Sequence, residues 1–156
     1  MLSVVAHGRA MEFSGLSQGT WFLQERNGKR TFGLAIKGPT GRMDALVFPE
    51  GEPPQVQLAG HPYAVFGFDD AIMRPDLDSL HFGPSQLGDL ISADKSFHLT
   101  VASPDGDRYT ANLTAGEQRA RREGPYASFS SWSVGVLRGQ EWIPLYTHGV
   151  PPSHAS

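Results

Sequence analysis

The stretch Phe97–Leu113, FHLTVASPDGDRYTANL, determines the pairing of two strands more tightly than any other part of the chain. Apolar and polar residues alternate on both sides of Ser103–Gly106, and this period of two marks half-buried strands. Ser-Pro-Asp-Gly suits a type I turn, because proline presets φ at the second position and glycine accepts the left-handed conformation that follows. The stretch therefore predicts a β-hairpin.

The register of this hairpin follows from its apolar residues. A two-residue loop would place Val101 opposite Arg108, whereas a three-residue loop with a glycine bulge places Val101 opposite Tyr109. The same count places Leu99 opposite Ala111. A slip of one residue would turn every apolar side chain to the wrong face, so we expect the second register. The inward face is then Phe97, Leu99, Val101, Tyr109, Ala111 and Leu113, and the polar outward face is His98, Thr100, Arg108, Thr110 and Asn112.

A second hairpin is predicted around Asn27-Gly28, the dipeptide that a type I′ turn prefers. Counting outward from this turn pairs Trp21 with Leu34, which places Trp21 inside the fold. On the other face Phe22 pairs with Gly33, so an aromatic ring would cover a strand glycine. Such cross-strand pairs contribute about 0.2–1 kcal/mol each, so the set of pairs matters more than any member.

The rest of the chain adds short strands, loops and two short helices. The remaining strands are predicted at residues 3–16, 42–48, 55–59, 62–68, 80–82, 127–137 and 141–146. We expect strands 55–59 and 62–68 to pair, and residues 69–78 to form a polar surface loop. Helical spacing predicts a helix over 83–93, and a capping-box pattern predicts another over 114–123. The sum is an all-β, mainly antiparallel fold, a β-sandwich or open barrel of about nine to eleven strands with two short helices.

Length and composition limit the kind of protein. The 156 residues suit a single β-rich domain, residues 1–149, followed by a loose C-terminal tail at 150–156. The absence of cysteine excludes disulfides and thiolate zinc sites. A formal net charge of −3 gives no electrostatic case for a nucleic-acid partner. No run reaches the roughly 18 apolar residues of a membrane helix, so we expect no membrane span. A homo-oligomer is compatible with the sequence.

Four segments share a pattern with a known family. They are Val56–Asp70 (VQLAGHPYAVFGFDD), the amphipathic segment Gln86–Ile91, the opening hairpin and Leu113–Ala120 (LTAGEQRA). Together they make the stretch from Arg42 to Arg122 resemble the small envelope proteins of the invasion-associated locus B type from alphaproteobacteria. The cysteines usual in that family are absent here. The resemblance implies a β-rich, non-enzymatic module of the bacterial envelope or surface.

The N-terminus does not decide the compartment. Residues 1–7 are too short, and lack the basic residues, to form a secretory signal peptide. The expected location is periplasmic or secreted if a signal peptide has been removed, and cytoplasmic otherwise.

One polar segment carries side chains that suit a metal ion. Hard cations prefer several carboxylate oxygens on a flexible loop, and Asp76-x-Asp78 supplies two carboxylates at alternate residues. The candidate metal ligands are Asp69, Asp70, Asp76, Asp78 and His81. A metal-assisted hydrolase would use His61, Asp69, Asp70 and His81. The competing interpretation is a solvated loop in which the aspartates form turns.

Two other groups are candidates for ligand binding. Arg119, Arg121 and Arg122 lie on the second predicted helix, with Arg108 nearby, and suit a phosphate, a carboxylate or an acidic partner. Trp142 is the best candidate for an exposed aromatic platform that binds a sugar ring or a protein. The competing interpretations are a solvated helix face for the arginines and a core position for the tryptophan.

No catalytic motif accompanies these candidates. The chain has no G-x-S-x-G elbow, no P-loop and no H-E-x-x-H pair, and no cofactor is implied. We therefore predict a non-catalytic binding or interaction module that recognises a protein or a small ligand. The alternatives are a glycan-binding β-sandwich and a small metal-assisted hydrolase.

Overall fold

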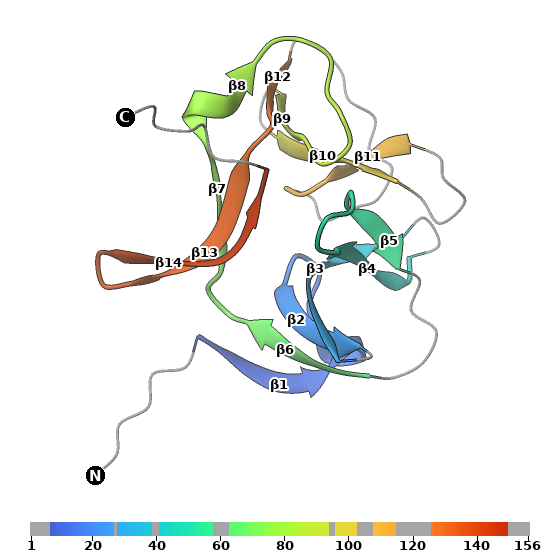
Figure 1. Cartoon of the computed structure of the whole chain (residues 1–156). Coiled ribbons are helices and arrows are strands. Elements are labelled where there is room, and N and C mark those ends of the chain that lie inside the picture. Colours follow the sequence, from blue (N-terminus) through green and yellow to red (C-terminus); the bar gives the residue numbers. More distant parts are fainter. Residues whose placement is uncertain are drawn as a thin grey trace.

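The computed structural model describes residues 7–26, 28–38, 41–57, 63–93, 96–102, 108–114 and 126–149. It confirms the all-β fold class (Figure 1). The strands are β1 (Gly8–Glu12), β2 (Trp21–Arg26), β3 (Lys29–Lys37), β4 (Met43–Phe48), β5 (Gln55–Gln57), β6 (Ala64–Phe68), β7 (Ile72–Pro75), β8 (Leu80–His81), β9 (Leu90–Ala93), β10 (Ser96–Ala102), β11 (Arg108–Asn112), β12 (Tyr126–Phe129), β13 (Trp132–Arg138) and β14 (Glu141–His148), and the two 3-10 turns are η1 (Phe13–Gly15) and η2 (Leu77–Ser79).

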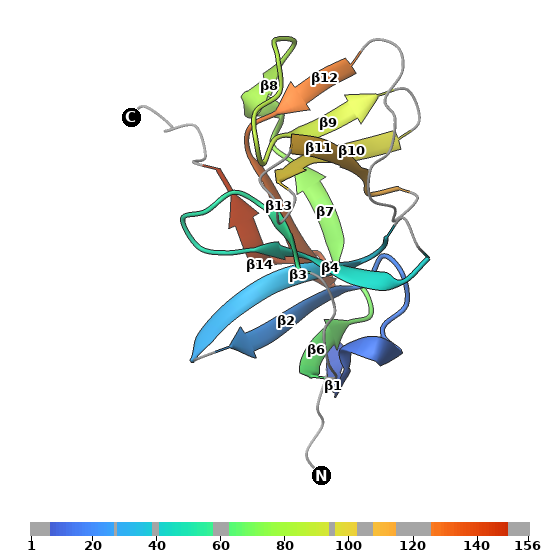
Figure 2. The same ribbon diagram turned by 90° about the vertical axis from the view of Figure 1, so that its right-hand side faces the viewer.

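The strands form two sheets. The larger sheet has eleven strands in the order β1-β6-β2-β3-β4-β5-β10-β9-β12-β8, with β11 paired to β10, and the smaller sheet has the order β14-β13-β7. Among the described strands, all pairs are antiparallel except a single parallel bridge between β5 and β10. Figures 1 and 2 show the larger sheet curving from β1 to β8, with the smaller sheet alongside. The main apolar core lies between them, because it combines Leu34 and Leu99 of the larger sheet with Trp132 and Val134 of the smaller.

Both predicted hairpin registers are confirmed. In β10–β11, Val101 pairs with Tyr109, and Leu99 is buried opposite Ala111. In β2–β3, Phe22 pairs with Gly33, as the count from Asn27-Gly28 requires. A Cβ atom on Gly33 would lie 2.5 Å from the Phe22 ring, so the glycine makes room for the aromatic side chain.

The predicted outward face of β10 is wrong in one respect, because His98 and Thr100 are both buried. The turn before β9 packs against this strand: the Thr100 hydroxyl donates to the Ser85 hydroxyl at 3.2 Å. The backbone N–H of Gly88 donates to the Thr100 carbonyl at 2.8 Å. From His98 to Val101, the alternating side chains of β10 therefore point to two faces that are both covered, whereas Phe97 at the start of the strand is exposed.

The helix predicted over 83–93 is wrong, because this segment is a turn followed by β9. The Asp89 carboxylate accepts the backbone N–H of Gln86 at 2.8 Å, and Gly88 has a φ of 90°, in the left-handed region. Leu90 and Ile91 are both fully buried in a strand that pairs with β10 and β12. Their spacing reflects a strand covered on both faces. The second predicted helix extends into residues 115–125, which lie outside the described residues.

Three other expectations need correction. The segments 55–59 and 62–68 contain β5 and β6, which do not pair: β5 joins β4 and β10, and β6 joins β1 and β2. The predicted loop 69–78 contains β7, which completes the smaller sheet, with Pro75 on an edge strand where its missing N–H is tolerated. These added short strands raise the count of described strands to fourteen, above the expected nine to eleven.

The β13–β14 hairpin contains a bulge. Gly135 pairs with Pro144, but Val134 pairs with Tyr146, so Leu145 is an extra residue in β14. Because of it, Tyr146 packs on the core with the buried Val134, while Pro144 remains exposed.

The predicted tail at 150–156 lies outside the described residues. Among the residues with a described position, no helix has the length and apolar character that crossing a membrane requires.

Truncating Leu99 tests the core. Leu99 is fully buried, so Leu99→Ala is expected to lower the free energy of unfolding by about 2–5 kcal/mol. Leu77 is 75% exposed, so Leu77→Ala should change it by no more than about 0.5 kcal/mol. Urea denaturation of both variants measures the difference. Equal losses in the two variants would contradict the burial of β10.

Candidate functional site

A cleft of about 1090 Å³ opens beside β14, and we call it the β14 cleft. Four segments form its walls: the β2–β3 hairpin, the β4–β5 loop, the turn before β9 and the end of β14. The lining residues are Leu23, Arg30, Phe32, residues 49–53, Gln86, Leu87 and residues 145–149. Its volume is comparable to the largest small-molecule sites, which range from about 300 to 1,000 Å³.

The β4–β5 loop forms one rim because its sequence cannot continue a strand. Pro49, Pro53 and Pro54 lack the N–H that a central strand donates. Gly51 has a φ of 74°, which suits the tight turn at the loop tip. The Gln55 side chain donates to the Glu52 carboxylate at 3.3 Å, which orients one of the two acidic side chains on this rim.

The floor of the β14 cleft is aromatic. Tyr146 stacks in parallel on the buried Phe32, with ring centroids 5.5 Å apart and an angle of 7° between the planes. It also contacts Phe48 and Trp132, at centroid distances of 5.2 and 5.6 Å. Burial raises the pKa of Tyr146 to about 12. The Tyr146 hydroxyl is therefore protonated at neutral pH and able to donate a hydrogen bond.

His148 lies next to Tyr146 on the same face of β14. Its imidazole stacks on Trp132 with a centroid distance of 5.1 Å, and its Nδ1 lies 3.4 Å from the Tyr146 hydroxyl. Burial lowers the pKa of His148, and the negative charge of Asp89 opposes this change only in part. The imidazole is therefore neutral at neutral pH.

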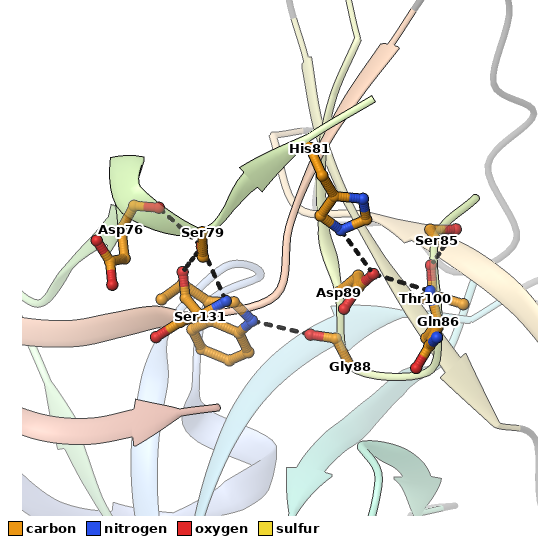
Figure 3. Close-up of polar contacts among 10 residues, drawn as sticks. Asp76, Ser79, His81, Ser85, Gln86, Gly88, Asp89, Thr100 and Ser131 are labelled. Carbon is orange, nitrogen blue, oxygen red and sulfur yellow. Dashed lines mark hydrogen bonds and ion pairs between the residues drawn. The ribbon is translucent and has the colours of Figure 1, made fainter. Parts of the chain in front are cut away.

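The turn before β9 holds His148 from the other side. The Trp132 indole N–H donates to the Gly88 carbonyl at 2.9 Å in a buried hydrogen bond (Figure 3). A Cβ atom on Gly88 would collide with the His148 imidazole, so the glycine allows the ring to approach the backbone. Asp89 is 5% exposed, and its Oδ2 lies 3.5 Å from His81 Nε2. Figure 3 shows His81 and Gln86 around this carboxylate.

A second groove, of about 510 Å³, lies on the outer face of the smaller sheet, and we call it the outer groove. It contains Trp142, the predicted aromatic platform, which is half-buried. The other lining residues are Arg74, Pro75, Asp76, Leu77, Ser131, Trp132, Ser133, Pro144 and Thr147.

Three of the predicted metal ligands, Asp70, Asp76 and His81, each contact a different partner. The Asp70 carboxylate lies within hydrogen-bonding distance of His7 Nδ1, at 2.7 Å, and the backbone N–H of Asp69 donates to the His7 carbonyl. Asp76 caps η2 by accepting the backbone N–H of Asp78 at 3.1 Å.

His81, the fifth predicted ligand, approaches Asp89 instead. Across the described part of the chain, no group of three or more histidine or acidic side chains is arranged to hold a metal ion. His61, which the hydrolase alternative needs, lies outside that part.

The predicted basic site stays a prediction. Arg119, Arg121 and Arg122 lie outside the described residues, and Arg108 is placed only through its backbone in β11.

Sequence reasoning missed Asp89 and His148. The alternation of Tyr146 and His148 shows that they share a strand face, but nothing local places that face against the turn at Gly88 and Asp89.

No protein-family model matches this chain, and neither a curated protein nor a solved structure matches it. The resemblance to the invasion-associated locus B type therefore stays a prediction.

The titration of His148 tests the geometry of the site. We expect its pKa to lie below the ordinary value of about 6.5, because burial disfavours the imidazolium. Asp89→Asn should lower this pKa further, since it removes the carboxylate that attracts the charged ring. An NMR titration of the imidazole signals measures both values. A pKa above 6.5, or a rise in Asp89→Asn, would disagree with the structure.

The lowered pKa of His148 also makes the stability of the fold depend on pH. With a depressed pKa in the folded state, the unfolded chain binds the His148 proton more tightly. The corresponding stabilisation is present above about pH 6.5 and is lost as the pH falls toward the folded-state pKa. His148→Gln should reduce this pH dependence in thermal melts.

Proposed function

We propose that this protein is a non-catalytic binding module that takes a small ligand with an aromatic or apolar body in the β14 cleft. The observation that carries the proposal is the floor of the cleft, where Tyr146 lies flat on Phe32 over the core. Ligand sites typically combine such an apolar surface with a few convergent polar groups. Here those groups are Tyr146 and His148, which lie 3.4 Å apart.

The polar groups also restrict the ligand. Tyr146 and His148 are both neutral at neutral pH, because burial raises the pKa of the tyrosine and lowers the pKa of the histidine. A neutral hydroxyl or amide on the ligand would exchange hydrogen bonds with them without placing a charge at depth. The charged side chains of the cleft, Arg30, Glu50 and Glu52, are exposed at its rim. Their exposure places them to contact a polar end of the ligand near solvent.

A small metal-assisted hydrolase has less support, because the described residues contain no group of three or more histidine or acidic side chains arranged to hold a metal ion, and three of the predicted ligands contact different partners. Asp70 pairs with His7, Asp76 caps η2 and His81 approaches Asp89. A location in the envelope rests on the family resemblance and remains an expectation.

Glycan binding is a second candidate, and a different observation favours it. Trp142 lines the outer groove together with the hydroxyl side chains Ser133 and Thr147 and the carboxylate of Asp76. Arg74 lies over the Trp142 ring, so the apolar surface for sugar C–H groups comes from the part of Trp142 that lines the groove and from the exposed Pro144. The hydroxyls and the carboxylate are the polar partners for the sugar hydroxyls.

Fragment binding tests the β14 cleft. Indole, phenol and benzamide are added separately to the labelled protein, and backbone amide shifts are followed by NMR. We expect the largest shifts at residues 86–87 and 145–148, which line the cleft. Shifts concentrated on another surface would overturn the proposal.

A pair of variants makes this test specific. Leu87 is 37% exposed and lines the cleft, so Leu87→Arg should weaken fragment binding about tenfold by placing a charge on an apolar wall. Leu137 is 45% exposed on the smaller sheet and is absent from the lining of the cleft, so Leu137→Arg is the matched control. Equal affinities in the two variants would count against the cleft as the binding site.

A further inference from the structure

Arg74 and Trp142 form a stacked pair on the outer face of the smaller sheet. The guanidinium carbon of Arg74 lies 4.0 Å from the centroid of the Trp142 ring, well within the distance of a cation–π interaction. Gly135 makes room for the indole on the neighbouring strand β13, because a Cβ atom there would lie 2.8 Å from the ring. Both side chains line the outer groove. The pair is therefore held in place by the sheet beneath it.

The contact with Trp142 does not neutralise the charge of Arg74. A guanidinium that uses its flat face on an aromatic ring keeps its N–H donors in the plane, where they match a carboxylate in a two-point contact. Arg74 is exposed, and none of the ion pairs found among the described residues involves it. The groove thus presents a positive group that is oriented but not neutralised by an ion pair within that part of the chain.

The remaining groups of the outer groove suit a polyhydroxylated molecule. Ser133 and Thr147 face each other across β13 and β14, so their hydroxyls present donors and acceptors side by side. Asp76 lines the same groove, and its backbone N–H donates to the Ser131 carbonyl at 3.0 Å. Its Oδ1 caps η2 by accepting the backbone N–H of Asp78, and its carboxylate also has a second oxygen. Pro144 adds an exposed apolar wall.

We propose that the outer groove binds an acidic sugar, whose carboxylate pairs with Arg74 and whose ring hydroxyls bond to Ser133, Thr147 and Asp76. This inference rests on the glycan-binding candidate described above. A carboxylate fits better than a phosphate, because Asp76 in the same groove repels a singly charged carboxylate less strongly than a doubly charged phosphate. The volume of about 510 Å³ lies within the range of small-molecule sites.

Calorimetry with matched ligands tests the assignment. The probes are trigalacturonate, a glucuronate trisaccharide and sialyllactose, each compared with its methyl ester, which keeps the sugar body and removes the charge. We expect at least one acid to bind about tenfold more tightly than its ester. Arg74→Gln should abolish this difference between acid and ester. Arg74→Lys, which keeps the charge and loses the planar two-point contact, should weaken binding of the acid about tenfold.

Arg138 provides the matched control for Arg74. Arg138 is exposed on the same strand as Ser133 and does not line the outer groove, so Arg138→Gln should bind the acid as the wild type does. Thermal melts show whether each variant is folded. An ester that binds as tightly as its acid overturns the inference and leaves glycan binding in place. No binding of any saccharide overturns both, and leaves the fragment test of the β14 cleft as a separate result.

Discussion

The hydrogen bond from the Trp132 indole to the Gly88 carbonyl is the constraint on which the junction of the two sheets depends. It is buried, and a buried donor without a partner would cost about 1–3 kcal/mol. It fixes the turn before β9 against β13, and the neighbouring strand β14 then brings His148 onto the same turn. Tyr146, stacked on Phe32, links β14 to the larger sheet. The β14 cleft follows from these contacts, since each holds one of its walls.

The features that the sequence predicts correctly are local ones. The β2–β3 register follows from Asn27-Gly28 and the alternation on either side, and the structure has the expected Trp21–Leu34 pair. The prediction of a helix over 83–93 is wrong because the spacing of Leu90 and Ile91 fits a helix face as well as a strand buried on both sides. Pairing with β10 and β12 decides in favour of the strand, and a local sequence pattern does not reveal that pairing.

The candidate sites show the same limit. Trp142 is identifiable from its position in the last predicted strand, and the structure places it in a groove. Its stacked partner Arg74 comes from β7, a segment whose polar residues and proline indicate a loop. The predicted aspartates lie close in sequence, but a turn and a strand direct Asp70 and Asp76 to different partners. Carboxylates that are close in the sequence are therefore not necessarily close enough in the fold to share a metal ion.

The extra residue Leu145 links the two sites. Successive side chains of a strand point to opposite faces, so one additional residue exchanges the faces of everything beyond it. Trp142 and Pro144 precede the bulge and line the outer groove, whereas Tyr146 and His148 follow it and line the β14 cleft. Substitutions at these four residues can adjust either surface separately. A one-residue insertion or deletion in this strand would alter both together, so the evolution of the two surfaces is constrained by the length of a single strand.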